Sequence, residues 1–502
     1  MATTEQHESV MFKIVKAVVK DGVGARLGTL SLPKRRPIDT PNFIGLTARG
    51  AVPHLTPDNI SKLSELSGVY IALEDFLETT RKKVSPPLLE MKSEHTDPLH
   101  AFTAMPSHIF TILGARRHSA INSPLGNTKD SISIFTSTGF QTLTTGAYHQ
   151  TVDVVKPDVV IPLADMTYSQ ATGFAQTKRR RNVSSSKRQL RMVERTEDWL
   201  AQFFQAFEHD DRDESAPAVF APLLPISYPT QWEYVSQLEQ DFATKLSGLA
   251  VYDVDVLPDL SNHGPLIPLP RLSLDHIATP QEILRQVHLG VDLFNVSFLN
   301  SISDAGIALS FTFPPPSVSS DGIRPLGINM WSTEHEAAVK PLVPGCKCYA
   351  CTKHHRAFLH HLLNAKEMLG WTLLQVHNYQ AMSDFFAGIR ASLDADPPTF
   401  EQGSDAFTRV YDSELPTGTG TRPRARGYHF KSRGGDDKIN PPAWENYGAK
   451  GDPVPEEEMA GLAVTEAEAV AVELVAEKET PPLIPDADAT ELDRKGFAEI
   501  SS

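Results

Sequence analysis

The sequence predicts an α/β barrel that carries a metal-binding insertion and an acidic C-terminal tail. From about residue 25 to 395, short β-rich runs alternate with longer helical patterns, which is the rhythm of parallel βα units. All three cysteines lie within six residues of one another, which is a poor disulfide framework and a good metal-ligand cluster. Residues 451–502 hold fourteen Asp or Glu and three Lys or Arg, so they carry −11 of the net charge of −15 and leave −4 for residues 1–450.

The predicted strands are runs of mostly apolar residues, as expected for strands that are covered on both faces. They are Val159–Leu163, Val219–Leu224, Leu249–Val254, Val291–Phe298 and Ile307–Phe313. With 502 residues, the chain is long enough for one large barrel plus attachments. It contains no run of about 18 apolar residues, so no segment is expected to span a bilayer.

Helical patterns lie between these runs. The clearest is the stretch TPQEILRQVHLG, in which Thr279 and Glu282 form a capping box, Pro280 takes the first helical position and Gly290 ends the helix. A second helical region, rich in histidine and leucine, runs from about Thr352 to Leu393, with a break predicted near Gly370.

We therefore expect three parts. Residues 11–340 form the barrel body, residues 341–395 form a zinc-binding subdomain with the closing helices of the barrel, and residues 396–502 form a flexible linker and a disordered acidic, low-complexity tail. The first twenty residues carry Glu5 and Glu8 ahead of a short apolar patch, which fits neither a secretory signal nor a transit peptide. The cytoplasm is the expected location.

The most specific motif is Cys346-Lys-Cys348-Tyr-Ala-Cys351, followed by histidines. Three thiolates and one imidazole make a set that tetrahedral Zn²⁺ prefers, and a set that leaves no position for water is structural rather than catalytic. The alternative is three incidental cysteines. By spacing alone five residues compete for the fourth ligand: His354, His355, His360, His361 and His377.

These motifs resemble the queuine tRNA-ribosyltransferase (tRNA-guanine transglycosylase) family, whose zinc site has the same C-x-C-x-x-C arrangement. Three further segments are similar to that family: ARLGTLSLPKRRPIDTPNFIGLTARGAVPHLTPD at 25–58, SGLAVYD at 247–253 and KHHRAFLHHLLNAKEMLGWTLLQVHN at 353–378. The resemblance covers roughly residues 11–395. It implies a (β/α)₈ TIM barrel and a Cys₃His zinc site, one ion per subunit, with His377 as the fourth ligand.

In that family a carboxylate attacks the anomeric carbon and the enzyme holds a covalent ribosyl intermediate, as in retaining glycoside chemistry. The nucleophile lies in a Gly-Ile-Asp-x-Phe-Asp pattern. The matching stretch here runs from Gly290 to Asn295, so the resemblance places Asn295 at the nucleophile's position. An uncharged amide oxygen is a feeble nucleophile.

The second family carboxylate lies in a Thr-Asp-Ser-Gly-Gly-Phe-Gln motif, which reads FTSTGFQ at 135–141 here. Thr136 stands at the acid's position, and a threonine hydroxyl is no base near neutral pH. Thr138, Pro225 and Tyr252 depart from the family pattern as well, whereas Asp165 keeps the place of a base-recognition acid. The chain therefore resembles a non-catalytic, accessory member of the family that pairs with a catalytic homologue.

Such a subunit would support exchange of guanine for queuine at the wobble position 34 of tRNAs with GUN anticodons, as a heterodimer. Expected nucleic-acid contacts form a basic cluster: Lys178, Arg179, Arg180, Arg181, Lys187, Arg188 and Arg191, with Arg195 on the same helical face. The alternative is a solvated helix face. The helices after the cysteines carry more apolar residues than one face needs, which suits a partner subunit or burial within the chain's own barrel.

Two other functions remain open from the sequence. One is an active transglycosylase or nucleoside hydrolase that uses a relocated acid such as Asp292 or Asp165. The other is a stand-alone RNA- or queuine-binding protein. The resemblance also implies a peripheral association with the mitochondrial outer membrane.

Overall fold

A computed structural model describes most of the chain up to residue 423. The described residues are 11–19, 22–62, 66–77, 85–91, 97–118, 126–136, 139–166, 185–207, 216–316, 322–395 and 398–423. The expected acidic tail therefore lies outside them, except for the first part of the expected linker.

Eight parallel strands close into a barrel, which confirms the predicted fold class. Around the barrel their order is β10, β11, β12, β13, β4, β5, β6 and β9. Their bounds are Asn42–Leu46 (β4), Gly68–Ala72 (β5), Phe110–Gly114 (β6), Val159–Val160 (β9), Ala218–Leu223 (β10), Gly248–Val251 (β11), Arg271–Ser273 (β12) and Leu293–Asn295 (β13). Because all eight run in the same direction, the residues that follow each strand gather at one end, the mouth of the barrel.

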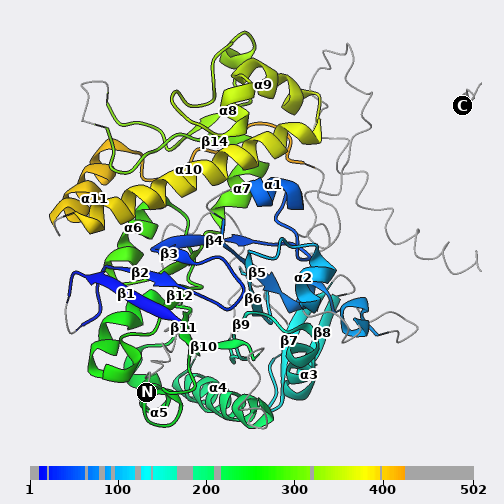
Figure 1. Cartoon of the computed structure of the whole chain (residues 1–502), viewed down its shortest axis with the longest axis vertical. Coiled ribbons are helices and arrows are strands. Elements are labelled where there is room, and N and C mark those ends of the chain that lie inside the picture. Colours follow the sequence, from blue (N-terminus) through cyan, green and yellow to red (C-terminus); the bar gives the residue numbers. More distant parts are fainter. Residues whose placement is uncertain are drawn as a thin grey trace, which may run out of the picture. The chain divides into compact units, whose positions relative to one another are not determined.

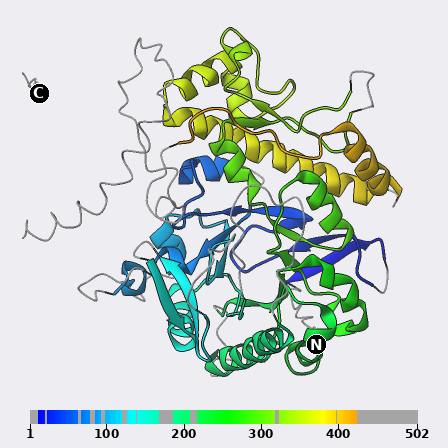
Figure 2. The same cartoon turned by 180° about the vertical axis from the view of Figure 1, so that it is seen from behind.

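Helices surround the barrel, as Figures 1 and 2 show from opposite sides. They are α1 (Pro57–Lys62), α2 (Pro98–Thr103), α3 (Thr145–Val155), α4 (Ser186–Phe207), α5 (Tyr228–Gln237), α6 (Pro280–His288) and α7 (Phe298–Asp304). The capping box predicted for α6 is confirmed, because the Thr279 hydroxyl accepts from the Glu282 amide and the Glu282 carboxylate accepts from the Ala278 amide. Gly290, at φ +81°, follows the helix.

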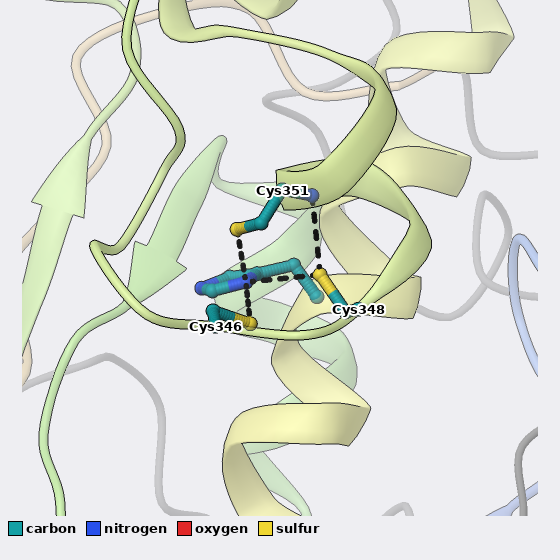
Figure 3. Close-up of side chains that lie close together, drawn as sticks. Cys346, Cys348 and Cys351 are labelled. Carbon is teal, nitrogen blue, oxygen red and sulfur yellow. Dashed lines mark hydrogen bonds between the residues drawn. The ribbon is translucent and has the colours of Figure 1, made fainter.

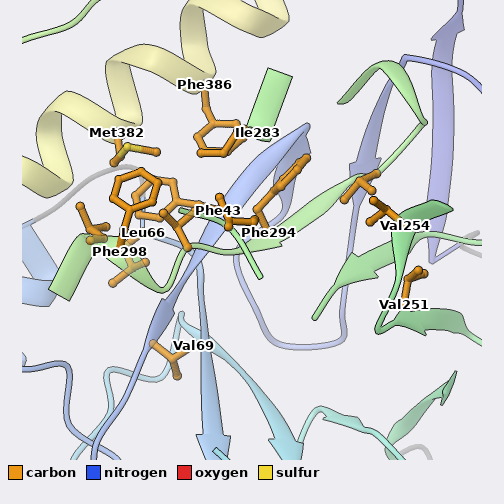
Figure 4. Packing of buried hydrophobic residues seen from close by; sticks show 14 of the residues in the cluster. Phe43, Leu66, Val69, Val251, Val254, Ile283, Phe294, Phe298, Met382 and Phe386 are labelled. Carbon is orange, nitrogen blue, oxygen red and sulfur yellow. The ribbon is translucent and has the colours of Figure 1, made fainter. Parts of the chain in front are cut away.

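Alternation along the strands separates two packed layers. Leu293 of β13 packs inside the barrel with Leu272 of β12, whereas its neighbour Phe294 packs outside. There Phe294 and Phe43 lie 5.3 and 5.7 Å, centroid to centroid, from Phe386 of the long helix α10 (Met368–Asp394). Figure 4 shows these rings together. The barrel wall and α10 therefore share one continuous apolar core.

The chain beyond the barrel forms a second layer over α10. Helices α8 (Tyr349–Lys353) and α9 (Arg356–Asn364) lie on the far side of α10 from the barrel (Figure 1). The break that was predicted near Gly370 falls at residues 365–367. Gly370 itself lies in the first turn of α10, where a Cβ would approach Leu362 and Leu363 to 3.2 Å.

Two expectations from the sequence are corrected here. The run Ile307–Phe313 is not a barrel strand: β14 (Ile307–Leu309) pairs antiparallel with β15 (Gly327–Asn329), outside the barrel. Ordered structure also continues past residue 395, because α11 (Pro398–Val410) buries Phe407 against the rings of Phe311 and Phe385. The remaining domain boundaries stay a prediction.

A small sheet covers the barrel end opposite the mouth. Strands β1 (Phe12–Ala17), β2 (Arg26–Leu30) and β3 (Ile38–Thr40) form it, and its apolar side chains join the cluster inside the barrel. A hairpin of β7 (Ser131–Thr136) and β8 (Gly139–Thr144) lies between β6 and α3 in the chain. No described helix combines the length and the apolarity needed to cross a membrane.

One buried ion pair ties the small sheet to the barrel. Asp292 immediately precedes β13, and its carboxylate accepts from Nε and Nη2 of Arg26, at 2.9 and 2.5 Å, and from the backbone amide of Arg271. The Arg271 side chain is also buried, and burial together with Arg26 lowers its pKa to about 9. The carboxylate of Asp292 therefore pairs directly with the Arg26 guanidinium, and its charge also favours the charged form of Arg271.

We predict that Asp292→Asn lowers the free energy of unfolding by about 3–5 kcal/mol, because breaking a buried pair leaves charge without compensation. Urea unfolding followed by fluorescence measures this. Asp39→Asn, which changes an exposed carboxylate of β3, is the matched control and should cost less than about 1 kcal/mol. Equal losses in the two variants would contradict the assigned role of Asp292.

Candidate functional site

Three thiols and one imidazole converge beside the start of α8. The sulfur atoms of Cys346, Cys348 and Cys351 lie 3.6, 3.6 and 3.4 Å from Nδ1 of His377, and the four ligand atoms all lie within 4.8 Å of one another. Figure 3 shows the side chains of the three cysteines close together. Cys348 is also the N-cap of α8, since its sulfur accepts from the Cys351 amide. In the described part of the chain, this group is the one that could hold a metal ion.

The spacing of these atoms fits a zinc ion. Tetrahedral bonds of about 2.3 Å to sulfur and about 2.0–2.1 Å to nitrogen would separate each sulfur from the nitrogen by about 3.5 Å. Hydrogen bonds with Cys346 and Cys348 lower the pKa of Cys351 to about 3. Hydrogen bonds with Cys346 and Cys351 instead raise the pKa of Cys348. The three thiols therefore compete for protons, and a divalent cation is the partner that would stabilise all three as thiolates.

The second ring nitrogen of His377 is also engaged. Nε2 donates to the carbonyl of Leu309 at 2.8 Å, which leaves Nδ1 as the lone-pair nitrogen that faces the sulfurs. The adjacent Asn378 accepts from the Leu309 amide and donates to Ser303 Oγ and to the Ile307 carbonyl, at 2.8–2.9 Å. β14 is thereby held against α10, and the imidazole is fixed in orientation before any ion binds.

The competing histidines have other contacts. His354 stacks on Phe358, with centroids 5.0 Å apart, and the His355 Nδ1 caps α9 by accepting from the Phe358 amide. His360 contacts the Asn364 amide. None of these, nor His361, belongs to the described metal group, so the structure brings together the four residues that the family resemblance selected.

At the mouth of the barrel, Asn295 occupies the last position of β13. Its side chain is fully buried, and neither its amide nitrogen nor its oxygen has a hydrogen-bond partner among the described residues. It points into the barrel, because Leu293, two residues earlier, packs inside. Thr136 is the last residue of β7, and its hydroxyl donates to the Gly139 carbonyl at 3.0 Å. An amide and a hydroxyl therefore stand at these two strand ends.

The two acids considered as relocated catalytic groups are both engaged in buried contacts. Asp292 lies at the opposite end of β13 from the mouth, within its contacts to Arg26 and Arg271. Asp165 follows β9 at the mouth and is fully buried. Its carboxylate accepts from Asn127 Nδ2 at 2.7 Å, from Arg188 Nη2 at 3.2 Å and from Arg195 Nη1 at 2.8 Å.

A small, partly open pocket lies where residues 161–166 follow β9. Its volume is about 30 Å³, which is enough for a water molecule. It is lined by Ala115, Arg116, Arg117, Ile132, Ile161, Pro162, Leu163, Ala164, Met166 and Tyr252. Nearby, Arg117 pairs with Asp75, and the buried carboxylate of Glu74 accepts from the amides of Arg117 and Phe135. Burial raises the pKa of Glu74.

The predicted basic cluster divides into three sets. Residues 178–181 lie outside the described residues. Lys187 and Arg191 are exposed on α4. Arg188 and Arg195 contact Asp165, as given above.

Most of the additional apolar residues noted after the cysteines are buried within the chain. Leu359, Leu363, Trp371, Leu373 and Leu374 are buried within the chain. Four other apolar residues of this region remain exposed: Val339, Tyr349, Met368 and Leu369, with 78, 58, 58 and 46% of their surface accessible.

Comparison with known proteins identifies the family. The queuine tRNA-ribosyltransferase family profile matches residues 21–413, so the chain belongs to that family. A protein of Schizosaccharomyces pombe named queuine tRNA-ribosyltransferase accessory subunit 2 is 34% identical over 84% of this chain and 89% of its own length. Proteins with the same name from Drosophila grimshawi and Danio rerio are both 27% identical, over 76% and 74% of this chain and 89% and 94% of their own lengths.

We predict one zinc ion per purified chain. Cys348→Ala should abolish stoichiometric zinc and lower the melting temperature, because a closed site contributes folding energy. Metal analysis by mass spectrometry together with thermal unfolding measures both. His361→Ala, a histidine outside the metal group, is the matched control and should retain zinc; a well-folded, zinc-free wild-type chain would contradict the assignment.

We predict opposite effects for two substitutions of Asn295. Asn295→Leu should raise the free energy of unfolding by about 1–3 kcal/mol, because it removes a buried amide that lacks partners. Asn295→Asp should lower it, since a carboxylate would be buried without a donor and its folded-state pKa would rise. This loss of unfolding free energy should be absent below the pKa of about 3.9 that the new carboxyl has in the unfolded chain. It should grow as the pH rises above that value. Urea titrations at several pH values test this; an Asn295→Asp variant that is equally stable at neutral pH would contradict it.

Proposed function

We propose that the chain is the non-catalytic subunit of a heterodimeric queuine tRNA-ribosyltransferase. It supports exchange of guanine for queuine at wobble position 34 of tRNAs with GUN anticodons, by pairing with a catalytic subunit and by contacting tRNA. The complex acts in the cytoplasm and associates peripherally with the mitochondrial outer membrane, as the family resemblance implies. The accessory-subunit name of the relatives supports this assignment.

The observation that carries the proposal is the chemistry of the barrel mouth. Base exchange through a covalent ribosyl intermediate needs an ionised carboxylate that can reach the anomeric carbon. Asn295 offers a buried, uncharged amide in the position that the family resemblance gives to the nucleophile, and Thr136 offers a hydroxyl in place of the second acid.

Neither relocated acid supports an active enzyme. Asp292 lies at the end of β13 that the small sheet covers, and its oxygens are occupied by Arg26 and Arg271. Asp165 lies at the mouth, but three side-chain donors neutralise and bury it. A carboxylate held in this way is a weak nucleophile and a weak base, because its charge is already stabilised.

In this proposal zinc has a structural role. Cys346, Cys348, Cys351 and His377 would hold one ion, and the closed set would supply folding energy rather than an activated water. The metal would tie the loop before α8 to α10, and through Phe386 to the barrel wall.

The same region offers a surface for the catalytic partner. Val339, Tyr349, Met368 and Leu369 expose apolar and aromatic surface around the metal-bearing elements. Of these types, tyrosine and methionine are enriched at protein interfaces. Their position agrees with the family resemblance, which implies that the zinc subdomain lies at the dimer interface.

We predict that the isolated chain shows no base exchange and that exchange appears when the catalytic homologue is added. Incorporation of labelled guanine into tRNA measures the activity, and size-exclusion chromatography measures pairing. Met368→Glu should weaken pairing at least tenfold, because it places a charge in an apolar interface. Val15→Glu changes an equally exposed residue of β1 and should have no effect.

Robust exchange by the single chain would refute the proposal in favour of an active enzyme. Absence of co-elution with the catalytic homologue would instead favour a stand-alone RNA- or queuine-binding protein.

A further inference from the structure

Helix α4 begins at the mouth of the barrel. It carries two pairs of basic side chains, one pair in contact with the protein and one pair exposed. Arg188 and Arg195, two turns apart on one face, point inward to the carboxylate of Asp165. Lys187 and Arg191, one turn apart on the adjoining, outward side of the helix, are exposed, and neither forms an ion pair with a described residue. Leu190, half of whose surface is accessible, lies between them on this outer face.

The charge of the outer face changes sign along the helix. Lys187 and Arg191 occupy the first two turns, whereas the exposed side chains Glu194 and Asp198 follow on the same face. The helix dipole adds positive potential at the start of α4. An extended polyanion would therefore be attracted to the first two turns and repelled by the next two.

Asp165 holds this end of the helix in place. Besides its three side-chain donors, its backbone amide donates to the Thr196 hydroxyl at 3.0 Å. Asn127 extends the network, because its carbonyl accepts from Arg195 and its side-chain oxygen accepts from Arg116 Nη2. One buried carboxylate thus connects the start of α4 with the segments that follow β6 and β9.

We propose that Asp165 is a positioning residue, and that its ion pairs with Arg188 and Arg195 hold α4 so that Lys187 and Arg191 contact phosphates of RNA. The proposal rests on the tRNA contact in the proposed function and specifies its residues. Arg188 and Arg195 act on the protein side of the helix and contact no phosphate. Such contacts give affinity and orientation without reading sequence.

The test measures binding of a labelled anticodon stem-loop RNA to the full chain, by fluorescence anisotropy over a series of salt concentrations. Lys187→Ala/Arg191→Ala should reduce the slope of log affinity against log salt by about one to two, since each lost phosphate contact removes up to about one unit. The control Lys62→Ala/Arg409→Ala removes the same charge from exposed positions of α1 and α11 and should leave the slope unchanged.

Asp165→Asn tests the positioning role. It should weaken RNA binding in the otherwise wild-type chain and have no further effect in the Lys187→Ala/Arg191→Ala background, although it lowers the melting temperature in both. A purely structural role would weaken binding equally in the two backgrounds. If Asp165→Asn does not fold, Arg195→Ala breaks the same ion pair and should show the same dependence on background.

An unchanged salt slope for Lys187→Ala/Arg191→Ala, as a merely solvated helix face would give, overturns the inference, and so does equal weakening by Asp165→Asn in both backgrounds. The proposed function is tested separately by base exchange with the catalytic homologue. Reconstituted exchange with an unchanged slope would leave the proposed function intact and reject these phosphate contacts.

Discussion

The structure depends on the imidazole of His377, where the barrel and the layer beyond it are joined. One ring nitrogen faces the three sulfurs, and the other donates to Leu309 of β14. The same helix packs its aromatic side chains on Phe43 and Phe294 of the barrel wall. A single helix thus connects the residues that could hold a metal ion with strands on the other side of the apolar core.

The two ends of β13 illustrate how structure and chemistry separate in this fold. At one end the carboxylate of Asp292 accepts from the Arg26 side chain and from the backbone amide of Arg271, and serves stability. At the other end Asn295 is buried, and its amide has no hydrogen-bond partner in the part of the chain that the structure describes, which is costly for a polar group. Residues at the mouth of an α/β barrel are generally retained for function and those at the opposite end for stability. The two ends of β13 therefore differ in how far their buried polar side chains are satisfied.

Much of the fold could be predicted from local patterns. The alternation of strands and helices gave the barrel, and Thr279 and Glu282 gave the start of α6, because capping depends on neighbouring residues. The short run Ile307–Phe313 was misassigned, because a short apolar run does not reveal whether its partner belongs to the barrel. Helix α11 was missed because its surroundings are rich in proline, glycine and charge, while Phe400 and Phe407, the residues that anchor it, find their partners far away in the sequence.

Part of the candidate site could likewise be predicted from the sequence, and part of it could not. Cysteine spacing indicated a metal, and the family resemblance selected His377 from five histidines. The contacts of Asp165 and Asp292 were not predictable, since Arg26 lies 266 residues from Asp292 and no sequence signal marks Asn127 as a partner of Asp165. Asn378 had one available signal, its position directly after the histidine ligand.

The central claim is that the barrel keeps its architecture while it lacks a carboxylate able to attack a ribosyl carbon. Mass spectrometry of the isolated, zinc-loaded chain after incubation with substrate tRNA tests this most directly. The account predicts that only the unmodified chain mass is found. A covalent RNA adduct that maps to an Asp or Glu at the barrel mouth would contradict it.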